Sequence, residues 1–374
     1  MRRLSSSTRV FRFVAPVLVL VASACGSGDS APTTAAEAAP DSVVMTSEPV
    51  DTTAVPEPST IVVTTSILGA VVSDVVGDAA DVVVLIPNGL DPHDWEPSAK
   101  DVEAINKADL VVANGLDLEE KLIDTLEVAE GAGVRVFHAT DHIVALDGED
   151  HDEAHGDEAH GDEAHGDEAH GDEAHDDEAH DDEAHDDEAH GDEAKTDDHG
   201  HDHAEGDPHF WTDPLAMAAV VAALGDELAA IGVDVSDRVD RVITDLNDVD
   251  GVITQLLSSL PDDRRLLVTG HDSLGYFAEH YGFTLIGSII PSLSSAAEVT
   301  AKNLAELKEA IGKTGASVIF TELGTPTDVA DALADETGTR VVELATHLVP
   351  DDNLYRSFLL NLASDIVAAL SATS

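Results

Sequence analysis

Short apolar runs alternate with helical segments along most of this chain, and that alternation restricts the possible folds more than any other feature. Asp81–Ile86 is apolar after its first residue, which is typical of a strand covered on both faces of its sheet. Helical spacing precedes it at Ile67–Val76 and follows it at Pro97–Lys107. Strands that alternate with helices build parallel sheets from βα units. We therefore predict an α/β fold with parallel sheets.

The alternation occurs twice, on either side of a long helical stretch. The first set of strands and helices lies in residues 60–234 and includes an expected helix at Asp117–Ala129. The second lies in residues 261–374 and includes an expected helix at Ala296–Ile311. Residues 235–260 between them keep a helical pattern, with Gly251 as the one strong breaker. We predict two parallel-sheet α/β lobes, joined by this long linking helix, with a cleft between the lobes.

The first 25 residues are typical of an export signal. Four arginines flank the start of an apolar run, Phe13–Val21, which is too short for a spanning helix because that needs about 20 apolar residues. Ala22-Ser23-Ala24-Cys25 resembles a bacterial lipobox, in which the cysteine is acylated and becomes the mature N-terminus. An ordinary cleaved signal with an incidental cysteine is the alternative. Residues 26–59 lack apolar periodicity and predict a disordered tether.

The chain has a net charge of −58, with 76 acidic residues against 18 lysines and arginines. Nucleic acid and anionic membrane surfaces are polyanions, so this charge excludes them as default partners. It would attract divalent cations, and it would equally suit a secreted surface selected for solubility.

A pentad repeat interrupts the first lobe at residues 149–203. From His155 to His190 a histidine recurs every five residues, separated by Gly or Asp, Asp, Glu and Ala. A five-residue step turns a helix by about 140°, so the histidines would form no stripe. Dense charge with few apolar residues predicts a disordered insert. Such a tract either binds metal weakly and many times over, or is a neutral, repeat-expanded linker.

Three histidines outside the insert occupy similar places. His93 follows the strand ending at Ile86, His209 directly precedes a helix, and His271 follows a strand in the second lobe. Ligands of open α/β sheets bind beyond the carboxyl ends of strands, so the three could meet in the cleft. Three neutral imidazoles with one further ligand form a tetrahedral site suited to Zn²⁺.

From Thr60 to about Ala372 the chain resembles the cluster A-I solute-binding proteins, the zinc- and manganese-specific receptors of ABC importers. Its most specific motifs are Asp91-Pro92-His93, Asp207-Pro208-His209 and Gly270-His271-Asp272. The resemblance implies two α/β lobes joined by a rigid long helix, with metal held between them by His93, His209 and His271. In manganese receptors the third position resembles a glutamate, whereas the histidine here favours zinc because imidazole is the softer ligand.

The fourth ligand is where the chain departs from the family, which usually places an aspartate after the last strand. Here the stretch Val342–Leu348 contains no aspartate, and the aligned place holds Ala345 or His347. We predict His347 as the fourth ligand. Asp351, Asp352 and water are the alternatives.

The sequence therefore predicts an extracellular zinc receptor that delivers Zn²⁺ to the permease of an ABC importer. We expect a monomer, anchored by lipid at the outer face of the cell membrane. A manganese receptor of the same family is one alternative, and a zinc buffer or adhesin without a transporter is another. The rival class is a zinc enzyme with three histidines and a water. The chain has no His-Glu-x-x-His motif, and the nearest candidate bases, Glu96 and Glu322, are equally explained as turn or packing carboxylates.

Overall fold

The computed structural model describes residues 58–147 and 206–372. The predicted signal peptide 1–25 with Cys25, nearly all of the predicted tether 26–59, and the predicted insert 149–203 lie outside the described residues. Among the described residues, no helix is long and apolar enough to cross a membrane.

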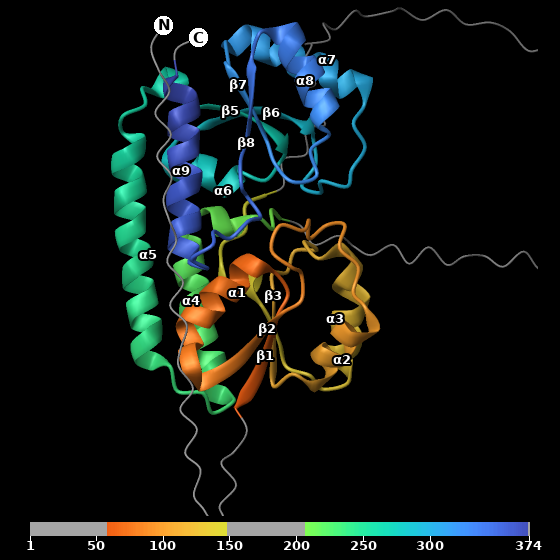
Figure 1. Ribbon diagram of the computed structural model, residues 1–374, viewed down its shortest axis with the longest axis vertical. Helices are drawn as coiled ribbons and strands as arrows, with labels where there is room; N and C mark the ends of the chain where they lie inside the picture. Colours follow the sequence, from red (N-terminus) through yellow and green to blue (C-terminus); the bar gives the residue numbers. More distant parts are fainter. Residues whose placement is uncertain (1–57, 148–205, 373–374) are drawn as a thin grey trace, which may run out of the picture. The chain divides into compact units, whose positions relative to one another are not determined.

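The first lobe contains a four-stranded parallel sheet with the strand order β2-β1-β3-β4 (Figure 1). Its strands are β1 (Ser59–Val63), β2 (Ala80–Val84), β3 (Leu110–Ala113) and β4 (Val136–His138). Successive side chains of a strand point to opposite faces, so β1 buries Ile61 and Val63 on one side and Val62 on the other. The first side packs against α1 (Ser66–Val76) and α4 (Pro214–Ala230), and the second against α2 (Ala99–Lys107) and α3 (Ile123–Gly131).

The apolar run after Asp81 is only partly covered, because β2 is an edge strand. Val83 and Val84 are 40% and 39% exposed, whereas Leu85 and Ile86 beyond the strand are buried. The prediction of a strand covered on both faces is therefore wrong for β2. It describes β3 instead, whose four residues are all buried.

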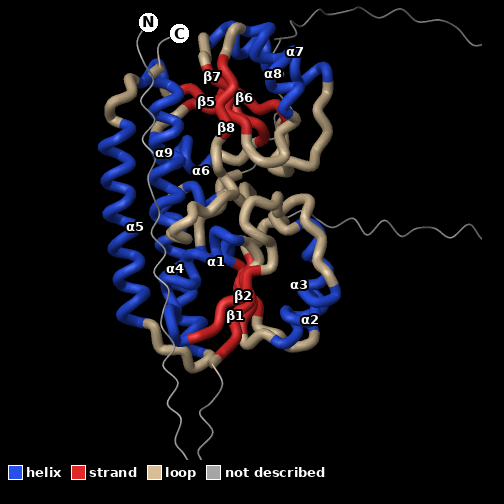
Figure 2. The backbone as a smooth tube through the Cα atoms, in the orientation of Figure 1, coloured by secondary structure: helices blue, strands red, loops and turns tan. Residues whose placement is uncertain are grey.

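The second lobe is built from two parallel strand pairs. β5 (Leu266–His271) pairs with β6 (Thr284–Ile290), and β7 (Val318–Thr321) pairs with β8 (Arg340–Glu343). β5 also lies beside β7, so the strands form one layer in Figure 2. The helices of this lobe are α6 (Gly275–Tyr281), α7 (Ala301–Thr314), α8 (Thr327–Thr337) and α9 (Tyr355–Ser371).

The long helix α5 (Ser236–Leu257) joins the two lobes in the sequence. It buries one stripe at helical spacing, made of Val239, Val242, Leu246, Val249, Ile253 and Leu257. This stripe packs against α4 and α9, and Figure 1 shows α5 running alongside both helices, with α9 above α4. The predicted fold class, two parallel α/β lobes with a long connecting helix, is confirmed.

Two predicted helices begin later than their apolar pattern suggests. The expected helix from Ala296 starts only at Ala301, because Thr300 caps α7 by accepting a hydrogen bond from Asn303 N. The expected helix from Asp117 is a turn first, since Leu116 and Asp117 have left-handed φ angles of 49° and 57°. Both displaced starts lie next to the site described below.

Candidate metal site

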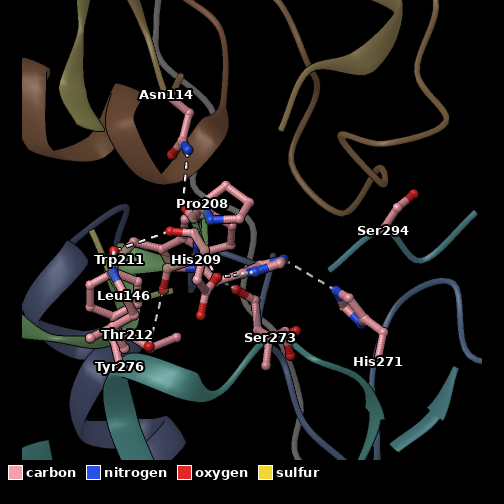
Figure 3. Close-up of polar contacts among 12 residues, drawn as sticks. Asn114, Leu146, Pro208, His209, Trp211, Thr212, His271, Ser273, Tyr276 and Ser294 are labelled. Atoms are coloured by element: carbon pink, nitrogen blue, oxygen red, sulfur yellow. Dashed lines mark hydrogen bonds and ion pairs between the residues drawn. The ribbon is translucent and has the colours of Figure 1, made fainter. Parts of the chain in front are cut away.

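The three predicted ligands meet inside the molecule. His93 lies in the loop between β2 and α2, His209 lies just before α4, and His271 is the last residue of β5. Their side chains are buried, with exposed fractions of 2%, 0% and 0%. Figure 3 shows His209 and His271 facing each other. Two segments of the first lobe, the loop after β2 and the turn before α4, thus meet the end of β5 in the second lobe.

The ring nitrogens of these histidines are spaced as metal ligands are. In the part of the chain that the structure describes, they form the one group of three or more potential ligand atoms within 4.8 Å of one another. The two Nε2 atoms of His209 and His271 lie 3.3 Å apart. Zinc–nitrogen bonds of about 2.0–2.1 Å in a tetrahedron place two nitrogens about 3.3–3.4 Å apart. Nε2 of His93 is buried and has no hydrogen-bond partner. One small cation therefore fits between the three rings.

A carboxylate stands behind each histidine. Glu120 Oε1 lies 3.2 Å from Nδ1 of His93, Asp207 Oδ1 lies 2.7 Å from Nδ1 of His209, and Glu322 Oε1 lies 3.2 Å from Nδ1 of His271. A carboxylate at Nδ1 fixes the tautomer and the orientation of the ring, and it makes the opposite nitrogen a better ligand. For His93 and His209 this leaves Nε2 for a metal. Nδ1 of His271 has no hydrogen-bond partner among the described residues and meets Glu322 only at ion-pair distance, while its Nε2 faces Nε2 of His209.

Small residues allow the carboxylates to approach this closely. A Cβ on Gly275 would lie 2.5 Å from Asp207 Oδ2, and one on Gly270 would collide with the hydroxyl of Thr325. Thr325 accepts a hydrogen bond from Glu322 N, and Ser273 Oγ donates to Glu322 Oε2 at 2.5 Å. The glycine of the Gly-His-Asp motif thus serves the packing behind His271.

The charges of the metal-free site follow from burial and from these pairs. The pKa of His209 lies well below 6.5, because burial and then the nearby His271 and His93 disfavour a charged ring. Burial also lowers the pKa of His271, but the charge of Glu322 outweighs it and the pKa is raised. Burial raises the pKa of Glu322, but His271 outweighs it and lowers the pKa to about 2. Burial raises the pKa of Asp207 to about 7. His209 is a neutral ring, whereas His271 and Glu322 form an ion pair.

His347 lies close to the three rings without belonging to their group. Its centroid is 6.0 Å from that of His271 and 6.3 Å from that of His209, against 5.1 Å between these two. Its Nδ1 is 3.0 Å from the hydroxyl of Thr346, and its buried Nε2 has no hydrogen-bond partner. Burial, followed by His271 and His209, lowers the pKa of His347 to about 3. The ring is neutral and offers one free nitrogen.

The alternative fourth ligands are placed differently. Asp351 and Asp352 are exposed. The carboxylate of Asp352 accepts hydrogen bonds from Leu354 N and from Ser357 Oγ at the start of α9. Asp352 is therefore engaged in holding the end of a helix.

The two acidic residues considered as candidate bases have structural roles. Glu96 is 75% exposed and pairs with Lys121. Glu322 is buried behind His271, where no substrate reaches it. The sequence did not predict a role for Glu120. The one indication of such a role is that Glu120 lies shortly after Asn114-Gly115, where a strand ends.

A cleft of about 2090 Å³ opens at the site and is lined by both lobes. His93, Glu120 and Asp207 line it from the first lobe and Asp272 from the second. Asp147 and Gly206, which flank the predicted insert, also belong to its lining.

Comparisons with known proteins give one consistent family. Residues 61–369 match the family described as zinc-uptake complex component A, periplasmic (ZnuA). The chain is 29% identical over 276 residues to the zinc-binding lipoprotein AdcA of Streptococcus pneumoniae, covering 71% of this chain and 45% of AdcA. It therefore spans about half the length of that relative. It is 25% identical over 301 residues to the zinc-binding protein TroA of Treponema pallidum, covering 77% of this chain and 80% of TroA.

Solved structures share the fold. The periplasmic zinc-binding protein TroA of Treponema pallidum superposes with a TM-score of 0.62 at 24% identity, over 84% of this chain and all of that one. A manganese-bound periplasmic protein of Candidatus Liberibacter asiaticus gives 0.61 at 18% identity, over 83% and 99%. Fe(III)-bound YtgA of Chlamydia trachomatis gives 0.62 at 19% identity, over 84% and 99%. The same fold thus occurs in proteins bound to different metals.

Proposed function

This chain belongs to the ZnuA family of metal-binding solute-binding proteins, which are receptors and not enzymes, and on that premise we propose that it captures Zn²⁺ for an ABC importer. His93, His209 and His271 hold the ion through Nε2. The observation that carries the proposal is the convergence of these three buried nitrogens, each with a carboxylate behind its ring.

The donor set favours zinc over manganese. All three members of the group are imidazoles, and each nearby carboxylate is turned to an Nδ1. Manganese prefers carboxylate and other oxygen ligands, whereas imidazole suits zinc. The relatives AdcA and TroA carry zinc in their names, which agrees with this preference. Proteins of the same fold also occur bound to manganese or iron, so the fold does not select a metal. The donor atoms of the site are therefore the stronger argument for zinc.

The fourth position is assigned to His347. Its Nε2 is buried without a hydrogen-bond partner, and an unsatisfied buried polar atom costs about 1–3 kcal/mol. Coordination of the cation would satisfy that nitrogen. Asp351 and Asp352 are less suited, because both are exposed.

The protein acts as a lipid-anchored monomer at the outer face of the cell membrane. Ala22-Ser23-Ala24-Cys25 supports acylation of Cys25, and the relative AdcA of Streptococcus pneumoniae is named a lipoprotein. A permease that accepts the released ion is the partner that such a receptor requires.

Competitive binding of zinc and manganese to the purified protein tests this function. The wild type should prefer zinc, and His271→Glu should lower zinc affinity and relatively favour manganese, because it replaces a nitrogen donor by an oxygen donor. His142→Glu makes the same change at an exposed ring outside the group and should leave both affinities unchanged. Zinc binding that is unaffected by His271→Glu would remove the basis for the three-histidine site.

A further inference from the structure

The two carboxylates that hold His93 are themselves held from the opposite lobe. Asp91 Oδ1 accepts a hydrogen bond from His93 N at 3.0 Å, and Glu120 Oε1 lies 3.2 Å from its Nδ1. Ser295 Oγ donates to Asp91 Oδ2 at 2.6 Å, and Ser294 Oγ donates to Glu120 Oε1. We name these four side chains, Asp91, Glu120, Ser294 and Ser295, the serine clasp.

The clasp distinguishes His93 from the other two ligands. Ser294 and Ser295 belong to the segment between β6 and α7 of the second lobe, whereas Asp91 and Glu120 belong to the first. The carboxylate behind His209 comes from its own segment, two residues away, and Glu322 comes from the same lobe as His271. Among the described residues, His93 is thus the one ligand of the three whose ring meets a carboxylate that also bonds to a side chain of the opposite lobe.

The segment that carries the serines is built for this contact. Ser294 N donates to Ser292 Oγ, and Ser294 Oγ accepts from Ala296 N, so the turn holds both hydroxyls toward the first lobe. Gly324 approaches from the second lobe with φ of 86°, and a Cβ there would lie 2.6 Å from Asp91 Oδ2 and 2.8 Å from Ser295 Cβ. Only glycine at position 324 leaves room for the hydrogen-bonded pair of Asp91 and Ser295.

We propose that Ser294 and Ser295 are positioning residues that couple contact between the lobes to the ligand state of His93. When the lobes meet, the serines fix Asp91, which holds the backbone N of His93, and Glu120, which holds Nδ1 of its ring. Nε2 is then directed toward the metal. When the clasp opens, His93 loses its orientation, and of the group of three only His209 and His271 remain in place. The clasp therefore sets how fast the metal leaves. This inference rests on the proposed function as a metal receptor.

The test compares zinc release from the wild type and from the double variant Ser294→Ala/Ser295→Ala. Groups behind metal ligands typically contribute about 10–100-fold in affinity, so we expect a loss of that size. It should fall mainly on the dissociation rate, measured by mixing the zinc-loaded protein with excess chelator. Ser259→Ala removes an exposed hydroxyl that bonds only to Leu256 O, and it should leave the rate unchanged. Ser294→Thr keeps a hydroxyl and should retain most of the affinity.

A double-mutant cycle with His93→Ala separates positioning from a general structural role. If the serines act through His93, the double serine substitution should change the zinc affinity of His93→Ala by less than about twofold. A full loss in that background would overturn the inference, as would wild-type release rates in the double variant itself. Each single serine variant gives the same comparison if the double variant does not fold, as judged by melting of the metal-free protein. A wild type that binds no zinc would instead refute the proposed function.

Discussion

At the residue scale, the site depends on which nitrogen of each ring is left free. Sequence motifs predicted the three histidines and included Asp207, which lies two residues from its ring. They did not predict the pairing of Glu120 with His93, 27 residues away, or of Glu322 with His271, 51 residues away. Such pairs form only when the loops fold together, so no local sequence pattern predicts them. The stretch after the last strand did predict His347 as a fourth ligand, and its ring centroid lies 6.0 Å from that of His271.

Zinc binding should release a proton from His271. The charge of Glu322 raises the pKa of His271 above its usual value, so the ring of the metal-free protein holds a proton at pH values up to that raised pKa. Metal must displace this proton, so affinity should fall about tenfold per pH unit below the pKa and level off above it. Calorimetry in buffers of different ionisation enthalpy measures the proton released. A binding enthalpy that is the same in every buffer at pH 6.5 would contradict the assignment.

Substitution of His347 should weaken zinc binding by far less than substitution of His93. His347 has no carboxylate behind its ring and lies outside the group of three, so it contributes as an adjustable fourth ligand. Affinities of His347→Ala and His93→Ala, measured by chelator competition, give the comparison. Equal losses would make His347 a full member of the group. No loss at all would assign the fourth position to water or a carboxylate.

At the element scale, periodicity predicted the helices better than the turns that aim the site residues. The stripe of α5 is regular over its whole length, and the helix was predicted nearly to its ends. The sequence predicted a helix from Asp117, where the structure instead has a left-handed turn at Leu116 and Asp117. That turn lets the buried carboxylate of Glu119 accept from Asn114 N and brings Glu120 to His93. Its geometry comes from these polar contacts, which periodicity does not record.

His280 should stabilise the junction of three helices. Its Nδ1 lies 2.8 Å from Asp213 Oδ1 at the start of α4, and its Nε2 lies 3.0 Å from Asp250 Oδ1 on α5. The three side chains are 16–23% exposed, so their pairing is only partly screened. His280→Ala should lower the free energy of unfolding by about 1–3 kcal/mol, because two partly buried carboxylates each lose one of their partners. Urea denaturation of the metal-free protein measures it.

Lys107→Ala is the matched comparison for that experiment. It removes an ion pair with Glu103 in which both side chains are more than half exposed, and such pairs add little to stability. The unfolding midpoint should therefore stay where it is in the wild type. Equal midpoints for His280→Ala and Lys107→Ala would show that the junction does not depend on the histidine.

At the scale of the whole molecule, the two flanks of the predicted insert are fastened to each other and to the second lobe. Asp207 N donates to Leu146 O at 2.8 Å. Tyr276 Oη accepts from Leu146 N and donates to Asp207 O at 3.1 Å. Leu146 and Asp207, on either side of the residues that the structure does not describe, thus lie next to each other, two residues before His209. Among the described residues, Asp207 is held by Leu146 and Tyr276 and in turn holds His209.

Deletion of Glu149–His203 should therefore leave the fold and the tight zinc site intact. What should fall is stoichiometry, because the intact protein carries twelve further histidines in the insert that can bind extra ions weakly. Those ions should be lost near pH 5 to 6, as free imidazoles with a pKa of about 6.5 become protonated. Calorimetry of both proteins at pH 7.5 and pH 5.5 measures the change. One site in both proteins would reduce the insert to a spacer, whereas loss of the tight site on deletion would mean that the insert supplies a ligand to the cleft.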